Sequence, residues 1–565
     1  MAQSFSQWAA LPDTEKVYAA VWTLQRIADG AAQTVRVATS GGVWDGSNYF
    51  TPCLIGIPSI SHSAQQLVSG QTMVSFGEME LALDPDVPVA GGLTLDQFLA
   101  DYAWAGQKIT LTVGDPDPTV LAWDNWGVVL RGHVGGPSFD DTTVSVPLYG
   151  RDEKLANAQV PPNLLDPDGW DKWAPSTVYA LGKFVSPPTS TGYYYECAKA
   201  GTSGATVPSW PDFPGAPVEE YDGGPVWTCR ELPQGAKGKP RPLVYGHCYN
   251  LTPVLIDTLD HLYLVNDPDL GPIQEVVAVY DGGYRWVAGT NYFVNLANGT
   301  IKLATEPEYG SITCEVKGRR IGGVYKEKPG EIAQDLVTSF GGFTTAEVDT
   351  ASVAAFNAAV PQAVGLFLDS QSPVMGAVES LLTGLTAVAG FNYAGQFQML
   401  RFTPPAGSPA LELSDAEILD FAVEPEDRLY HQARVGAGRV WTVQKEVDPV
   451  ADEDWRARVA EEYVWATAQD DTVKGLYPLA TTCEHGTLLY SATEGETVAA
   501  WWLALFGQRR RVLTIKLKLQ SLPLDLGALV RVTRERFGLA AGPLFRVVGF
   551  AEDHQNATIT MKLWG

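Results

Sequence analysis

Hydrophobic and polar residues alternate along many short segments of this chain. The clearest segment is 511–520, where every second residue is apolar, so we expect a half-buried strand whose successive side chains point to opposite faces. Its apolar face comprises Leu513, Ile515, Leu517 and Leu519. Other β-rich runs recur roughly every ten residues towards both ends of the chain, a spacing typical of antiparallel barrels or sandwiches.

Turn and helix signals divide the middle of the chain. The pairs Asp281-Gly282 and Asn298-Gly299 each stand between apolar runs and predict hairpins. Helices are predicted at 331–340, which stops at two glycines, at 348–360, which stops before a proline, and at 374–389, which is continuously apolar on one face.

Capping patterns predict two more helices. Thr94 is a suitable N-cap for a short helix at 95–101. The run Thr493-Glu-Gly-Glu496 has the spacing of a capping box and precedes an apolar helix at 498–506. The basic run 508–511 follows that helix, and cations near a helix C-terminus are the ordinary explanation for such a run.

The fold class predicted is mainly β with some α, in several domains. A chain of 565 residues is too long for one hydrophobic core. We expect antiparallel barrels or sandwiches, a small aromatic-rich β insert and a helical segment. The expected boundaries are 1–160 (β-rich), 161–235 (insert), 236–330 (β-rich), 331–400 (helices leading into strands) and 401–565 (β-barrel-like).

Composition and charge exclude several classes of protein. An apolar fraction of 45% with only 18% charged residues indicates a folded chain rather than a disordered one. The net charge of −26 repels phosphate, so specific nucleic-acid binding is not expected. Neither a signal peptide nor an uncharged apolar stretch of membrane-spanning length is recognisable, so folding in a cytoplasm is expected.

Catalytic and metal-binding motifs are missing from the sequence, and we expect no enzyme, metal or cofactor. There is no phosphate-binding loop, nucleophile elbow or HExxH motif, and the six scattered cysteines form no CxxC pair. Adjacent acids occur at Asp152-Glu153, Glu219-Glu220 and Glu461-Glu462. Because adjacent side chains diverge in a strand, these pairs are expected to be solvated surface acids.

Among the segments of the chain, the insert gives the most specific binding hypothesis. Exposed Trp and Tyr rings stack on the flat C–H faces of sugars, so a dense group of aromatics predicts a carbohydrate platform. The other reading is that the rings form the insert's own core, which its small size favours. Two of its cysteines, Cys197 and Cys229, could face each other across a sheet and form a late disulfide, although a cytoplasm disfavours an early one. The candidate carbohydrate-binding residues are Trp173, Tyr179, Tyr195, Trp210 and Trp227.

The insert also has an ordered series of aromatic, small and cysteine positions. The series is Trp173, Tyr179, Gly182, Val185, Tyr195, Cys197, Pro208 and Trp227. It resembles the small chitin-binding-type carbohydrate modules, and similar inserts recur in phage tail proteins. This chain has an additional Gly-Ala-Thr-Val-Pro segment before Trp210 that departs from that pattern.

Three further stretches carry a resemblance outside the insert. They are 74–81 with 101–108, 237–246 with 253–257, and 524–533 with 545–549 and 562–564. In this order they look like the tail-hub proteins of siphophages and gene transfer agents. The resemblance implies hub β-barrels that assemble as a homotrimer at the tail tip, close the tail tube and open for genome delivery.

The same resemblance implies partners and a location. The expected partners are a distal tail protein, the tape measure protein, receptor-binding or fibre proteins and a cell-surface glycan, in a virion assembled in the host cytoplasm. Some such hubs hold an iron–sulfur cluster, which the scattered cysteines here do not match. We expect the Ala-rich helices between 348 and 389 to lie in the trimer interface or near the lumen. The alternatives are a carbohydrate-active enzyme and a receptor-binding adhesin.

Overall fold

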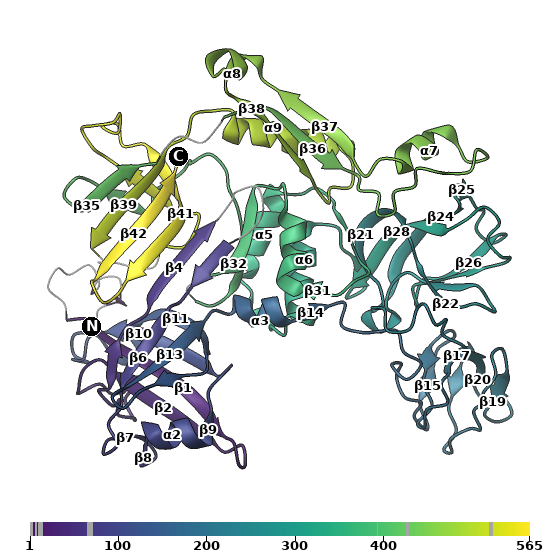
Figure 1. The fold of residues 1–565 in the computed structure, drawn as a ribbon, viewed down its shortest axis with the longest axis horizontal. Helices are drawn as coiled ribbons and strands as arrows, with labels where there is room; N and C mark the ends of the chain where they lie inside the picture. The colour runs from purple at the N-terminus through teal and green to yellow at the C-terminus, as the bar shows by residue number, and fades with distance from the viewer. Residues whose placement is uncertain are drawn as a thin grey trace.

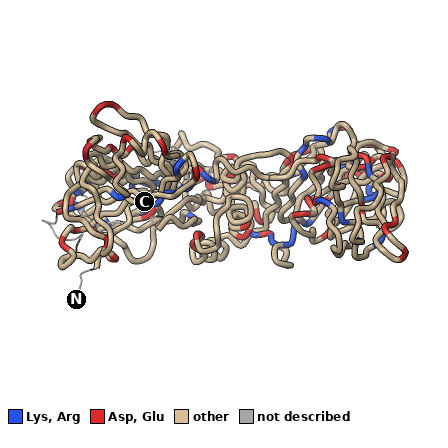
Figure 2. The backbone as a smooth tube through the Cα atoms, turned by 90° about the horizontal axis from the view of Figure 1, so that it is seen from below, with Lys and Arg blue, Asp and Glu red and all other residues tan. Residues whose placement is uncertain are grey.

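The chain folds into several antiparallel β-sheets around a central helical region. The computed structural model describes residues 4, 5, 8, 15–64, 72–392, 394–424, 429–518 and 524–565. Strands account for 41% and helices for 15%, with several antiparallel sheets and a half-barrel, which confirms the predicted mainly β, multi-domain fold. Figures 1 and 2 show an elongated, rather flat molecule whose N-terminal sheet and aromatic insert lie at opposite ends. Acidic residues are scattered along its whole length (Figure 2).

The N-terminal region is a large sheet with the order β2-β1-β10-β11-β13-β6-β3. Its buried side includes Trp22, Phe98 and Trp104. The helix predicted at 95–101 is confirmed as α2 (Leu95–Asp101) with Thr94 as N-cap. The strands are β1 (Val17–Arg26), β2 (Ala32–Ala38), β3 (Leu54–Gly56), β6 (Glu78–Ala82), β10 (Lys108–Gly114), β11 (Gly127–Val134) and β13 (Thr143–Tyr149).

Both ends of the chain contribute to one further sheet. A hairpin of β4 (Ser59–Ala64) and β5 (Thr72–Ser75) leaves the N-terminal region, and β4 pairs antiparallel with β41 (Leu544–Asp553). The other strands of this sheet are β34 (Leu411–Leu413), β35 (Ile418–Val423), β39 (Val512–Lys518), β40 (Leu529–Val532) and β42 (Thr558–Trp564). β39 confirms the alternating strand, although Leu519 and Gln520 lie outside the described residues.

A histidine lies in the seam between these two parts of the chain. His62 of β4 is opposite Phe550 of β41, and its ring stacks on that phenyl ring with centroids 5.0 Å apart. The Phe76 ring meets the imidazole edge-on at 5.7 Å. Burial lowers the pKa of His62 to about 4, although the Glu552 charge acts in the opposite direction.

We expect acid to weaken this seam. The unfolded chain protonates His62 near pH 6.5, whereas the folded chain does so only near pH 4. Stability is therefore lost as pH falls through that window, by about 3 kcal/mol. The measurement is urea unfolding at a series of pH values, comparing the protein with His62→Phe, which keeps a ring in place but cannot titrate. Equal pH slopes for the two proteins would contradict the assignment.

The middle of the chain forms two sheets. The larger has the order β25-β24-β28-β21-β30, and the smaller the order β22-β23-β27-β26. Both predicted hairpins are confirmed, because β24 pairs with β25 around Asp281-Gly282 and β26 pairs with β27 around Asn298-Gly299. The strands are β21 (Leu243–Leu251), β22 (Val254–Asp257), β23 (Leu262–Leu264), β24 (Ile273–Asp281), β25 (Tyr284–Arg285), β26 (Tyr292–Asn295), β27 (Thr300–Leu303), β28 (Ile312–Ile321) and β30 (Gly365–Leu368).

The helical region lies between the N- and C-terminal sheets on one side and the two middle sheets on the other (Figure 1), and it supplies the largest core. The predicted helix at 331–340 is α4 (Pro329–Asp335) continued by a π-helical turn, Leu336–Phe340, and capped by Gly341. The helix predicted at 348–360 is α5 (Thr350–Ala359). The single helix predicted at 374–389 is wrong, because α6 (Val374–Leu382) ends before Gly384, and the rest of the run belongs to β32 (Ala387–Phe391).

The position expected for these helices in an assembly stays a prediction. The buried faces of α5 and α6 belong to the central core of the protein itself, through residues such as Val353, Phe356 and Leu381. Only one face of α5 is solvent-exposed, where it presents alanines 351, 354, 355 and 358. The exposed alanine face of α5 is the part of these helices that a neighbouring subunit could contact.

A further unit, made of residues 429–507, lies above the helical core in Figure 1. It contains the sheet β37-β36-β38 and the helix α9 (Ala492–Phe506). The capping box is formed by Ser491 and Glu494, so the predicted box at 493–496 was two residues too late. Arg510 donates to the carbonyls of Leu505 and Ala504, as expected for a cation at a helix C-terminus. The other elements are α7 (Glu453–Val459), α8 (Asp471–Leu476), β36 (Tyr430–Ala437), β37 (Val464–Gln469) and β38 (Thr481–Gly486).

Candidate functional site

The aromatic insert contains a four-stranded sheet attached beside the small middle sheet (Figure 1). Its strands have the order β16-β17-β20-β19, and a two-stranded pair, β15 with β18, lies beside them. The strands are β15 (Val178–Tyr179), β16 (Phe184–Val185), β17 (Tyr194–Lys199), β18 (Gly201–Thr202), β19 (Pro217–Glu219) and β20 (Val226–Arg230).

The five predicted carbohydrate-binding residues meet in one cluster inside the insert. Trp173, Tyr179, Tyr195 and Trp227 are buried, and Trp210 is half-buried against them. The Tyr179 and Trp227 rings meet edge-on with centroids 4.9 Å apart, and the Tyr195 and Trp210 rings are 4.5 Å apart. The structure thus brings the predicted residues together, with their rings packed on one another rather than laid out as a flat surface.

One carboxylate organises this aromatic cluster. Glu220 Oε1 accepts hydrogen bonds from the indole N–H groups of Trp173 at 2.8 Å and Trp227 at 2.7 Å. Its Oε2 accepts the backbone N–H of Gly204 at 2.7 Å. The expectation that Glu219 and Glu220 are both solvated surface acids is wrong for Glu220. The spacing carried no signal for this role, because the two Trp donors come from distant parts of the insert.

We expect Glu220→Ala to destabilise the insert by about 2–4 kcal/mol, since it leaves the two indole donors and one backbone donor without their acceptor. The neighbouring Glu219 is exposed and lies 3.7 Å from Lys199, so Glu219→Ala is the matched control and should cost under about 0.5 kcal/mol. Hydrogen exchange of residues 161–235 measures both variants. Similar exchange in the two would show that the Glu220 contacts contribute little.

The two cysteines of the insert lie on paired strands. Cys197 is opposite Trp227, and Cys229 is opposite Tyr195, so the two are diagonal neighbours on β17 and β20. Both are free thiols in this structure. Burial raises the pKa of each to about 11, which disfavours the thiolate needed for disulfide formation.

A buried arginine fastens the insert to the middle of the chain. Arg241 is fully buried, and its guanidinium lies 3.6 Å from the ring centre of Trp170 in the insert. Its Nη1 pairs with Asp267 at 3.3 Å and with Asp269 at 2.7 Å, while its Nη2 donates to the carbonyl of Gly169 at 2.8 Å. One side chain therefore links two acids of the middle region to the insert.

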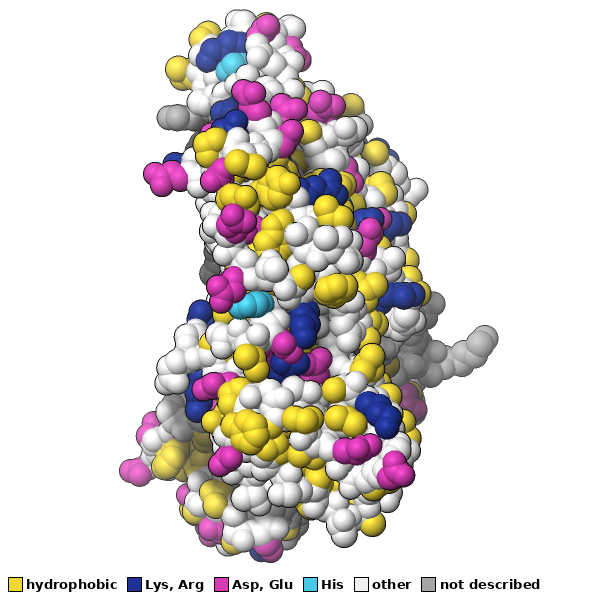
Figure 3. Space-filling view, turned by 90° about the vertical axis from the view of Figure 1, so that its right-hand side faces the viewer, with side chains coloured by type: hydrophobic (Ala, Val, Ile, Leu, Met, Phe, Trp, Pro, Cys, Tyr) yellow, Lys and Arg dark blue, Asp and Glu magenta, His cyan; other side chains and the backbone are white. Residues whose placement is uncertain are grey.

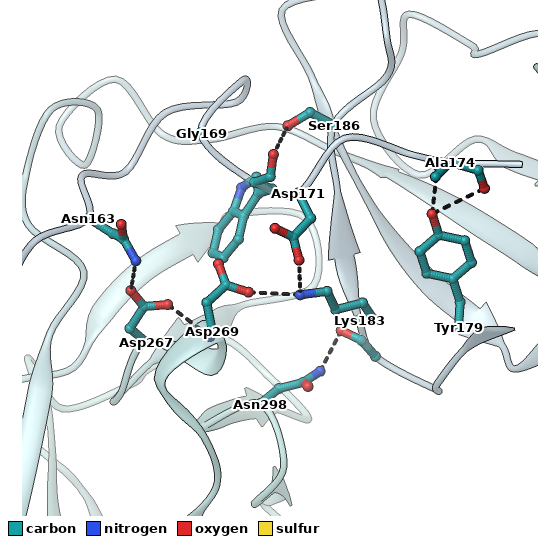
Figure 4. Close-up of polar contacts among 12 residues, drawn as sticks. Asn163, Gly169, Asp171, Ala174, Tyr179, Lys183, Ser186, Asp267, Asp269 and Asn298 are labelled. Atoms are coloured by element: carbon teal, nitrogen blue, oxygen red, sulfur yellow. Dashed lines mark hydrogen bonds and ion pairs between the residues drawn. The ribbon is translucent and has the colours of Figure 1, made fainter. Parts of the chain in front are cut away.

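A lysine makes a second link at the same junction (Figure 4). Lys183 of the insert contacts Asp269 and Asp171, each at 2.7 Å. Burial opposes the charged carboxylate of Asp269, but Lys183 and Arg241 outweigh it and hold its pKa below the usual range. Asn163 donates to Asp267 at 2.8 Å, and Asn298 donates to the carbonyl of Gly182.

The junction also has an apolar part. The insert residues Trp170, Phe184 and Tyr194 pack in one cluster with Ile256, Leu262 and Leu264 of the small middle sheet. The segments entering and leaving the insert are hydrogen-bonded to each other at 163–165 and 238–241 rather than being free linkers. The insert is therefore built into the molecule by a shared core and a buried ionic network.

Within the described ranges, no group of three or more His, Cys, Asp or Glu residues could hold a metal ion. None of the described helices is long and apolar enough to cross a membrane. Arg241 and Lys183 were not recognised from the sequence, since Asp267 lies 26 residues from Arg241 and Asp269 lies 86 residues from Lys183 along the chain.

Comparisons with known proteins give outline similarities only. No family model and no curated protein matches the chain. A tail protein from Neisseria meningitidis MC58 is 8% identical, with 97% of this chain and 96% of that chain covered and a TM-score of 0.38. A 43 kDa tail protein of prophage MuSo2 from Shewanella oneidensis is 9% identical, with coverages of 97% and 98% and a TM-score of 0.37. A chain of a native gene transfer agent virion is 11% identical, with coverages of 58% and 84% and a TM-score of 0.40.

Proposed function

We propose that this chain is a structural virion protein, the trimeric hub of a phage tail tip. The proposal rests on the hub-like stretches 74–81 and 524–533 with 545–549 and 562–564, which are far apart in sequence. Residues 74 and 75 of the first stretch belong to the sheet that contains the second, and residues 78–81 belong to β6 of the N-terminal sheet. The first begins in β5, whose partner β4 pairs with β41, and the second provides β40, β41 and β42. A sheet that joins the N-terminal region to residues 411–564 suits a subunit that must hold its shape in a ring.

Open sheet edges support assembly with further subunits. Strand β35 is at one end of the sheet just described, and it exposes Leu419 and Val423. The N-terminal region exposes Trp44 and Tyr49, whose rings are 5.4 Å apart. Unpaired edges and exposed aromatics are liabilities in a monomer and are covered in a closed oligomer.

The proposed neighbours are a second and third copy, the distal tail and tape measure proteins, and the receptor-binding or fibre proteins.

In this proposal the insert is a rigid outward extension of the hub, and the hub opens for genome delivery without itself being an enzyme. The alternative is an enzyme or adhesin that binds a glycan through the insert. Since the predicted rings are packed together, glycan contact by the insert would fall on its exposed aromatics Phe213 and Tyr221.

The test is the mass of the purified chain by light scattering, alone and mixed with the tail proteins encoded beside it, together with electron microscopy of antibody-labelled particles. A mass of three chains, alone or on mixing, with label at the tail tip supports the hub. A chain that stays monomeric in every mixture and is missing from particles overturns it. Turnover of a polysaccharide would favour the enzyme.

A further inference from the structure

A groove distinct from the insert lies between the larger middle sheet and the segment 438–463. It has a volume of about 620 Å³, within the range of about 300–1,000 Å³ found for ligand sites. Tyr280 and Trp455 line it, and their rings are nearly parallel, with centroids 4.1 Å apart and planes at 10°. Figure 3 shows hydrophobic side chains gathered on this side of the molecule above the level of the insert.

Both walls of the groove are held in place by the fold. Gly283, with φ of +89°, lies so close to Val447 that a side chain at this position would overlap it. Asp452 accepts the backbone N–H of Trp455 at 3.0 Å, which fixes the start of α7. Asn250 donates to the carbonyl of Thr442 at 2.6 Å and so ties the segment to the middle sheet. The groove is therefore formed before any ligand arrives.

Polar groups without partners surround the aromatic pair. The Trp455 indole N–H is buried and has no hydrogen-bond partner among the described residues. Arg285 and Asp454 line the groove and are exposed, and within the described part of the chain neither forms an ion pair. Each can form bidentate hydrogen bonds, the guanidinium as a donor and the carboxylate as an acceptor.

We propose that this groove binds a neutral oligosaccharide. A pyranose ring has an apolar C–H face that packs on an aromatic ring, and hydroxyls that both donate and accept hydrogen bonds. The groove offers Trp455 and Tyr284 for the first and Arg285 and Asp454 for the second. No part of this inference depends on the chain being a tail hub.

The charged residues that line the groove favour a neutral ligand over an anionic or a cationic one. The residues lining the groove include two acids, Asp452 and Asp454, and two arginines, Arg285 and Arg458. An anionic ligand would be repelled by the acids and a cationic one by the arginines. The balance favours an uncharged ligand that needs both donors and acceptors, which describes a neutral sugar chain better than a phosphate or a basic peptide.

The experiment titrates the 565-residue chain with cellotetraose, maltotetraose, N-acetylchitotetraose and, as an anionic probe, tetragalacturonate, and calorimetry measures the binding. At least one neutral probe should bind, with an affinity that changes little with salt, and Trp455→Ala should weaken it by about tenfold or more. Trp455→Phe keeps a stacking ring and should bind more tightly than Trp455→Ala. Trp44→Ala and Tyr221→Ala, which alter exposed rings elsewhere, should bind like the unmodified protein.

Hydrogen exchange of segment 438–463 checks that Trp455→Ala leaves the fold intact. The proposal is overturned if no neutral probe binds, if only tetragalacturonate binds, or if binding is lost in Tyr221→Ala and kept in Trp455→Ala. The last result would place the carbohydrate site on the insert. A trimer that binds no neutral probe would leave the hub proposal standing and remove this one.

Discussion

Replacing Arg241 with methionine should loosen the insert by about 3–5 kcal/mol, because it leaves the buried Asp267 carboxylate without its counter-charge. The same change removes the guanidinium from the Trp170 ring and from the carbonyl of Gly169. Hydrogen exchange of residues 161–240 is the measurement. Amides that exchange through local opening of the insert should exchange faster by about two to four powers of ten.

Two variants control this prediction. Lys172→Met removes an exposed ion pair with Asp168, which is 3.0 Å long, and should change stability by less than about 0.5 kcal/mol. Adding Asp267→Asn to Arg241→Met removes the unpaired charge and should recover part of the loss. Unchanged exchange in Arg241→Met would mean that the apolar cluster with Ile256, Leu262 and Leu264 alone holds the insert.

The buried junction affects function because it holds the insert rigidly on the rest of the molecule. A module on free linkers can search for its ligand, whereas one held by a buried network moves with the body that carries it. The junction contacts described above join the insert and Arg241 to the small middle sheet and to the segment 267–269 that follows β23. The insert is therefore suited to projecting from an assembly at a fixed angle.

Local patterns predicted much of the fold because the interactions behind them are local. Strict alternation predicted β39, and Asx-Gly pairs predicted both hairpins. The helix expected at 374–389 failed because a continuous apolar run is compatible with a buried helix and with a buried strand. Gly384, with φ of +78°, and Thr386, with φ of +52°, turn the chain between α6 and β32.

The candidate sites were harder to predict because their partners are distant in sequence. Counting aromatics identified the cluster of Trp173 and Trp227, but nothing local indicated that Glu220 would accept both indole N–H groups. The stack of Tyr280 on Trp455 joins residues on separate structural units. Composition can suggest a kind of chemistry, whereas only the fold determines which rings are packed inside and which line a groove.

The largest effect of a small substitution is expected at Gly246, where β21 and β30 meet. Gly246 has φ of +60° and is opposite Gly365, and a methyl group on it would overlap the carbonyl oxygen of Val364. Gly246→Ala must therefore either break this pairing or move a backbone, at a cost of about 4 kcal/mol or more. Thermal unfolding and hydrogen exchange of β21 and β30 are the measurements.

Gly289→Ala is the control for Gly246→Ala, because it separates the cost of backbone strain at a positive φ from the cost of steric overlap. Gly289 has φ of +77°, but nothing lies within 4 Å of the position its Cβ would take, so this control should cost only about 1 kcal/mol. Equal melting of the two variants would show that the strands shift to accept the methyl group. A much larger loss at Gly246 would mean that the β21–β30 pairing carries much of the stability of this part of the chain. It would act together with the contacts of Arg319 and Tyr245 to Asp335, which also join the larger middle sheet to the helical core.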